Sequence, residues 1–227
     1  MKLHPLFASA CLTLAAGVQA AAQSETPSQP PPIYRYLVVV DTSPAMSARK
    51  ETTSDTVHKL LFSGVLGRMR TGDTLGVWTC GTRDRRELVP ARIWDSRVRA
   101  RLDFANLIYR LLEQREFAGK AGLDTVIPDL NLEARRSGSL TVFLFTDGSK
   151  PVKGTPFDEG INRIFADHAA ELRKANKPFL TVLVADKGEW VAHSVNPGAL
   201  PIHIPSVPGP ERPAEKSEEE KRNQPGP

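Results

Sequence analysis

The sequence predicts an α/β fold with a central, mostly parallel sheet, one antiparallel edge strand and helices on both faces. Five short apolar runs have the length and composition of strands. Apolar stripes with helical spacing lie between them. Because strands and helices alternate along the chain, the helices are expected to cover a shared sheet.

The first strand is expected at 36–40 (YLVVV), a run that is apolar on both faces and therefore suited to a strand covered on both sides. Runs 140–145 and 179–184 repeat this pattern. Runs 75–80 and 88–94 are joined by a short charged turn, so they are expected to form an antiparallel hairpin.

Three apolar stripes and one shorter segment predict the helices. The first stripe is Val57, Leu60, Leu61, Val65 and Met69; the second is Val98, Leu102, Ala105, Ile108 and Leu112; the third is Ile161, Ile164, Phe165, His168, Ala169 and Leu172. The shorter helix is expected at 125–136, with Pro128 in its first turn. Together these elements predict a Rossmann-like three-layer sandwich over residues 33–205.

Residues 1–22 resemble a secretory signal peptide, with Lys2, an apolar stretch and small residues before the expected cleavage site. The stretch is shorter than the roughly 20 residues that span a bilayer, which favours cleavage over retention as an anchor. Residues 23–32 are a proline-rich linker, and residues 206–227 form a charged tail expected to be disordered. The protein is therefore expected to be secreted or periplasmic, and not an integral membrane protein after cleavage.

The chain of 227 residues has a formal charge of +4 and a pI near 9.2, an excess too small to indicate a nucleic-acid partner. Several arginines nevertheless gather in one stretch: Arg83, Arg85, Arg86, Arg92, Arg97, Arg99 and Arg101. They could contact anionic polymers or lipid headgroups, and solvated turn and helix faces explain them equally well. Cys80, the only cysteine after cleavage, lies in an apolar run and is expected to be a buried, unreactive thiol.

Two of the expected strands end in a carboxylate. Asp41 and Ser43 follow the strand at 36–40, and Asp147 follows the strand at 140–145. Ligands of open α/β sheets bind beyond the carboxyl ends of the strands, so these side chains are expected to face one crevice. Hard oxygen donors suit Mg²⁺, Mn²⁺ or Ca²⁺. The alternative is that both loops are ordinary hydrogen-bonded turns.

The segments 41–46 (DTSPAM) and 143–148 (FLFTDG) resemble the metal-site loops of von Willebrand factor type A (vWA) domains. The resemblance covers residues 33–205. It implies a metal-ion-dependent adhesion site in which Asp41, Ser43, Thr125 and Asp147 bind a divalent cation. Thr125 has a second interpretation, as the N-cap of the helix that follows, a role that Asp124 could also fill.

One position departs from the family pattern, because Ala45 stands where the resemblance places a second serine ligand. The resemblance implies a binding module rather than an enzyme, with a partner's Asp or Glu completing the coordination of the cation. Two alternatives remain. One is a degenerate domain that binds partners without metal, and the other is a Mg²⁺-dependent phosphoryl-transfer enzyme with Asp41 as nucleophile.

Overall fold

The computed structural model describes residues 33–81, 85–119, 122–196 and 201–206, which belong to one compact unit. The expected signal peptide and linker lie outside the described residues, as does the expected tail after residue 206. No helix in the described ranges combines the length and apolarity needed to cross a bilayer.

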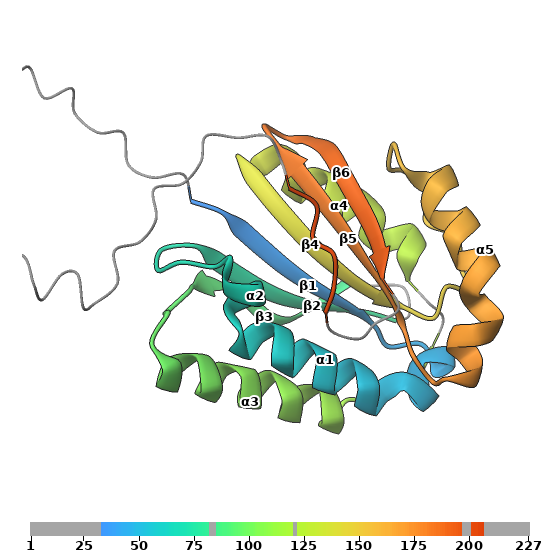
Figure 1. Cartoon of the computed structure of the whole chain (residues 1–227), viewed down its shortest axis with the longest axis horizontal. Coiled ribbons are helices and arrows are strands. Elements are labelled where there is room, and N and C mark those ends of the chain that lie inside the picture. Colours follow the sequence, from blue (N-terminus) through green and yellow to red (C-terminus); the bar gives the residue numbers. More distant parts are fainter. Residues whose placement is uncertain (1–32, 82–84, 120–121, 197–200, 207–227) are drawn as a thin grey trace, which may run out of the picture. The chain divides into compact units, whose positions relative to one another are not determined.

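Six strands form one sheet in the order β3-β2-β1-β4-β5-β6 (Figure 1). Their bounds are β1 Arg35–Asp41, β2 Thr74–Cys80, β3 Arg85–Ile93, β4 Ser139–Thr146, β5 Phe179–Asp186 and β6 Glu189–Asn196. β1 lies inside the sheet and pairs in parallel with both β2 and β4. The five predicted strands are present, and β2 and β3 form the predicted antiparallel pair.

The sheet is mixed, so the prediction of a mostly parallel sheet with one antiparallel edge strand is wrong. β5 runs antiparallel to β4, and β6 runs antiparallel to β5. β6 was not predicted, because most of its side chains are only partly buried and it has no continuous apolar run. Among the described strands, only the two pairings of β1 are parallel.

The direction of β5 follows from the connection that precedes it. The segment that follows β4 passes beside α4 (Leu123–Arg136), the helix that precedes β4 in the chain. There the side-chain amide of Asn131 on α4 donates a hydrogen bond to the carbonyl of Gly154 at 2.9 Å. Helix α5 (Asp158–Lys174) then leads back, and Phe179 pairs with Thr146, the last residue of β4. The chain therefore re-enters the sheet beside the end of β4, where it had left the sheet, so β5 has to run antiparallel to β4.

Helices cover both faces of the sheet. α1 (Lys50–Phe62) and α3 (Val98–Gln114) pack on one face, and α4 and α5 pack on the other (Figure 1). Ile202 and Ile204 also pack on the α1/α3 face. Two short helices complete the fold: the 3-10 helix η1 (Pro44–Arg49) after β1, and α2 (Gly64–Gly67) after α1.

Three details of the predicted helices are wrong. Val98 is 61% exposed, because it begins α3 beyond the part that faces the sheet. The His168 side chain is exposed and lies 3.4 Å from Glu171. Pro128 is inside α4 rather than in its first turn, since the helix begins at Leu123. Its missing N–H leaves the carbonyl of Asp124, an exposed residue, without its helical partner.

We expect Gly148→Ala to lower the free energy of unfolding by about 2–4 kcal/mol, because it combines left-handed backbone strain with overpacking. Gly148 has φ +72°, and an added Cβ would lie 2.5 Å from the ring of Phe179. Urea denaturation measures the loss. Gly67→Ala, with φ +77° and open space, should cost about 1 kcal/mol, and Gly138→Ala close to nothing. Equal losses in all three variants would show that neither backbone strain nor overpacking is specific to Gly148.

Candidate functional site

Asp41 and Asp147 lie at the same edge of the sheet, on neighbouring strands. β1 and β4 are parallel, with Val40 beside Phe145. Asp41 is the last residue of β1, and Asp147 directly follows β4. The negative charge of Asp147 is close enough to Asp41 to affect its titration. The structure therefore brings together the two carboxylates that the sequence predicted to share a crevice.

The Asp41 side chain is almost completely buried, with 1% of the residue exposed. Because side chains alternate along a strand, it points to the same face as Leu37 and Val39, the face covered by α4 and α5. One carboxylate oxygen, Oδ1, accepts a hydrogen bond from the backbone N–H of Ser43 at 2.8 Å. The other, Oδ2, is buried and has no hydrogen-bond partner among the described residues.

This environment changes the acidity of Asp41. Burial raises the pKa of Asp41 to about 6, because the charged form loses its hydration. This value already includes smaller effects: the N–H and hydroxyl of Ser43 lower the pKa of Asp41, and the negative charge of Asp147 raises it. A carboxylate in this position lacks a compensating positive charge from the described residues.

Ser43 contributes a second buried oxygen without a partner in the described part of the chain. Its hydroxyl lies near the Asp41 carboxylate without forming a well-aligned hydrogen bond. The backbone around it is fixed on both sides. The N–H of Thr42 donates to the carbonyl of Cys80 at 2.8 Å, and the N–H of Met46 donates to the carbonyl of Ser43 at 3.0 Å. The position of the Ser43 hydroxyl is therefore fixed by the backbone, although the hydroxyl has no hydrogen-bond partner among the described residues.

Asp147 is only partly buried and forms a similar turn. Its Oδ1 accepts hydrogen bonds from the backbone N–H of Ser149 at 3.1 Å and from the Ser149 hydroxyl at 2.8 Å. Both loops thus contain an Asp-x-Ser turn in which the aspartate binds the N–H two residues later. Sequence reasoning missed Ser149, although the repeated Asp-x-Ser spacing is a signal that could have found it.

Thr125 is in the first turn of α4. Its hydroxyl donates to the carbonyl of Gly122 at 2.8 Å, which leaves the oxygen able to act as an acceptor. The N-cap is Gly122 and receives no side-chain capping bond, so the alternative of Thr125 or Asp124 as N-cap is wrong. The N–H of Gly122 lowers the pKa of the Cys80 thiol, which indicates that the start of α4 lies close to Cys80 on β2. Cys80 in turn pairs with Asp41 on β1.

Cys80 is buried, as predicted, and it pairs with Asp41 across β2 and β1. Burial raises the pKa of the Cys80 thiol, and the charge of Asp41 raises it further. The thiol is therefore protonated and unreactive at neutral pH. The protonated Cys80 side chain therefore forms part of the apolar surroundings of the Asp41 carboxylate.

Ala45 and Ser47 are both exposed on η1, the short helix that follows Ser43. The buried Arg49 fixes this helix: its Nη1 donates to the carbonyl of Ala45 at 2.5 Å, and its Nε donates to the carbonyl of Lys177 at 3.1 Å. The segment that bears Ala45 is thus attached to the chain entering β5.

The oxygen donors at this edge fit a divalent cation. Within the described parts of the chain, no three or more His, Cys, Asp and Glu side chains form a metal-binding group. The donors brought together here are instead the carboxylates of Asp41 and Asp147 and the hydroxyl of Ser43, oxygen donors of the type that Mg²⁺, Mn²⁺ and Ca²⁺ prefer. The two orphaned oxygens, Asp41 Oδ2 and Ser43 Oγ, are the feature that favours a cation, because buried polar atoms without partners call for a water or an ion.

No protein-family model matches this chain, and no curated protein is significantly similar to it.

We expect Asp41→Asn to stabilise the protein at pH 7–8 in the presence of EDTA, by up to about 3 kcal/mol. Since the folded pKa of about 6 lies above the ordinary value of 3.8, the wild type loses stability as the pH rises from about 4 to about 6. The variant lacks this loss, so the two proteins should converge below about pH 4. Denaturation at a series of pH values measures the difference.

Asp167→Asn, at an exposed position on α5, is the matched control and should follow the wild type at every pH. A constant difference between Asp41→Asn and the wild type across the pH range would show that titration of the buried carboxylate is not its cause.

Proposed function

We propose that this domain is an exported protein-binding module of the vWA type, which engages a partner carboxylate through a divalent cation at the carboxyl edge of β1 and β4. The observation that supports it most is the pair of buried oxygens without partners, Asp41 Oδ2 and Ser43 Oγ, beside a second carboxylate. A bound Mg²⁺ or Mn²⁺ would supply a positive centre with an open coordination position for an Asp or Glu of the partner.

The residues of this site have different parts in the proposal. Asp41 and Ser43 hold the buried side of the cation, and Asp147 is the more exposed carboxylate. Thr125 supplies a hydroxyl from α4. With only two carboxylates, the site leaves a divalent cation without excess negative charge, so a partner's carboxylate is attracted to it.

The resemblance to vWA domains adds to this proposal through the segments 41–46 and 143–148. Ala45 weakens it, since a water must replace the hydroxyl that the resemblance places there. Loss of a supporting ligand typically lowers metal affinity about tenfold or more. The proposal therefore includes a cation site of reduced affinity, which Ala45→Ser should strengthen.

We expect Mn²⁺ at about a hundred times its dissociation constant to raise the melting temperature by roughly 5–10 °C, since binding to the native state alone stabilises it by about 2.7 kcal/mol. Asp41→Ala and Asp147→Ala should each abolish the rise. Ala45→Ser should shift the midpoint of the titration about tenfold lower. Ser47→Ala, on the same short helix, is the matched control and should behave as the wild type.

The same titration separates the alternatives. A wild type whose melting temperature does not change with Mn²⁺, Mg²⁺ or Ca²⁺ would support the degenerate domain. Cation-dependent hydrolysis of a phosphate ester, lost in Asp41→Ala, would support the phosphoryl-transfer enzyme.

The partner chemistry has its own test. We expect a fluorescent glutamate-rich peptide to bind the chain in Mn²⁺ and to dissociate when EDTA is added, because the carboxylate contact depends on the cation. Fluorescence anisotropy measures binding, and a peptide with glutamine in place of glutamate is the control. Binding that persists in EDTA, or that is equal for both peptides, would contradict a metal-bridged contact.

A further inference from the structure

Three aliphatic side chains are exposed at the edge of the sheet opposite Asp41. Ile93, at the end of β3, is 70% exposed; Val98, at the start of α3, is 61% exposed; and Leu66, in α2, is 41% exposed. β3 is antiparallel to β2, and Ile93 pairs with Thr74, the first residue of β2. We refer to Leu66, Ile93 and Val98, with Arg92 and Arg101, as the β3–α3 corner.

Several contacts join the segments that carry these side chains. The Arg92 guanidinium lies over the Phe104 ring of α3, 5.1 Å from its centroid. The Arg101 guanidinium lies over Phe62, at the end of α1, at 5.8 Å. Trp94 packs beneath, edge-on to Phe104, and an added Cβ on Gly64 would lie 3.5 Å from its ring.

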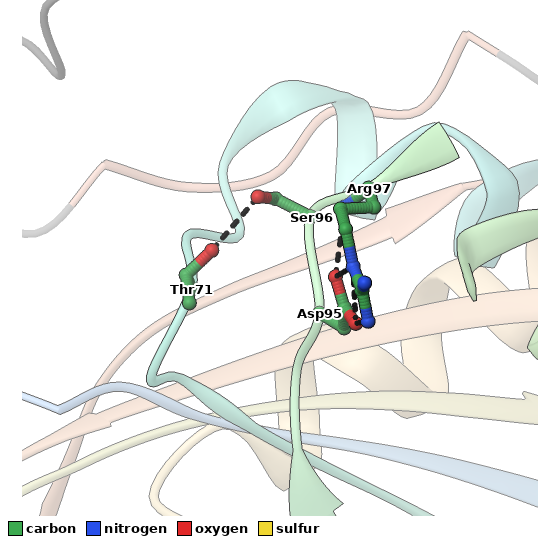
Figure 2. Close-up of polar contacts among 4 residues, drawn as sticks. All are labelled: Thr71, Asp95, Ser96 and Arg97. Carbon is green, nitrogen blue, oxygen red and sulfur yellow. Dashed lines mark hydrogen bonds and ion pairs between the residues drawn. The ribbon is translucent and has the colours of Figure 1, made fainter. Parts of the chain in front are cut away.

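The turns that border the corner are also joined. The hydroxyls of Thr71 and Ser96 lie 2.7 Å apart, and the Arg97 side chain binds Asp95 beside them (Figure 2). The backbone N–H of Trp94 donates to the carbonyl of Asp73 at 2.7 Å. The exposed side chains are therefore presented by a connected base.

Leu66 is held outward by a strained backbone. The four residues of α2, Gly64–Gly67, all have positive φ, including 54° at Val65 and 56° at Leu66. Left-handed conformations are unfavourable for both side chains, and most of all for a β-branched valine. Val65 is buried, which favours the turn, whereas Leu66 gains little burial in return. Strain of this kind is often retained where a segment has a function.

The charge of the corner complements an anionic surface. Neither Arg92 nor Arg101 has an ion pair with a described residue, and the Nε of Arg101 is buried without a hydrogen-bond partner in the same part of the chain. The neighbouring Arg97 and Arg99 are paired with Asp95 and Asp103. The Arg92 and Arg101 side chains therefore add positive charge to this end of the domain that no described carboxylate neutralises.

The form of this surface favours a lipid bilayer over a single acidic protein segment. The aliphatic side chains project from two connections, the α2 turn and the link between β3 and α3, with cationic groups at the same end of the strands, an arrangement that can enter an interface while binding headgroup phosphates. Ile33, where the described chain begins before β1, is 66% exposed at this same edge, since Arg35 pairs with Thr74. The chain therefore enters the domain at the edge that carries the corner.

We propose that the β3–α3 corner docks on an anionic lipid surface, with Leu66, Ile93 and Val98 entering the interface and Arg92 and Arg101 binding headgroup phosphates. Docking in this orientation places Asp41 and Asp147 at the edge of the sheet away from the membrane. This inference is independent of the proposed cation site.

The test places an environment-sensitive fluorophore at the corner of the full chain. Cys11→Ser removes the cysteine at position 11, Cys80 is buried, and Ser96→Cys supplies an exposed attachment point next to Arg97. With phosphatidylglycerol-containing vesicles we expect a blue shift of emission at position 96, and none with phosphatidylcholine alone. The control carries the label at Val191→Cys, an exposed position on β6, and should show no shift.

Variants in the labelled chain identify the groups responsible. Arg92→Gln with Arg101→Gln should weaken binding roughly twenty- to thirty-fold, since each arginine at an anionic surface contributes about a fivefold gain. Ile93→Ser with Val98→Ser should reduce the blue shift even at saturating lipid. The matched controls, Arg163→Gln with Arg173→Gln on α5 and Leu132→Ser on α4, should leave both readouts unchanged.

Three results would overturn the proposal. One is an equal shift at positions 96 and 191, and another is an equal response to phosphatidylcholine. The third is a shift at position 96 that grows with protein concentration in the absence of vesicles, which would assign the corner to a second copy of the chain.

Discussion

The burial of β1 on both faces is the constraint on which the rest of this structure depends. The strand lies between two parallel neighbours and under helices on each side, so every position from Tyr36 to Asp41 is removed from water. For the valines this burial is favourable. For Asp41 it removes the hydration of a carboxylate and leaves one oxygen without a partner among the described residues. The unusual chemistry of the site is thus a consequence of the packing that forms the core.

The sheet has two edges of different character. Beyond the carboxyl ends of β1 and β4, the loops present carboxylates and hydroxyls, several of them buried. At the other edge, the ends of β3 and α1 and the start of α3 present aliphatic side chains and arginines. Because α1 and α3 both run between these edges, the two surfaces are held apart by rigid elements. The proposed cation site and the β3–α3 corner therefore lie at opposite ends of the strands.

The shared position of Asp41 and Asp147 could be predicted from the sequence, whereas the directions of β5 and β6 could not. Asp41 and Asp147 were predicted to share an edge because each follows an apolar run, and the parallel pairing of β1 and β4 places both at that edge. The lack of hydrogen-bond partners for Asp41 Oδ2 and Ser43 Oγ could not be predicted, since it depends on which groups pack around these buried atoms in the folded chain. The alternative role of Thr125 as an N-cap also required coordinates to exclude.

The sequence by itself determined five of the six strands, the main helices and the position of the carboxylates along them, because burial periodicity and residue type are local properties. Only the tertiary structure decided the direction of β5 and the existence of β6, because a strand's direction depends on the path of the connection before it and not on its own residues. Tertiary structure likewise decided that Val98 lies outside the core although it fits the apolar stripe of α3. Helical spacing predicts which residues share a face, but the extent of the sheet beneath determines which of them are covered.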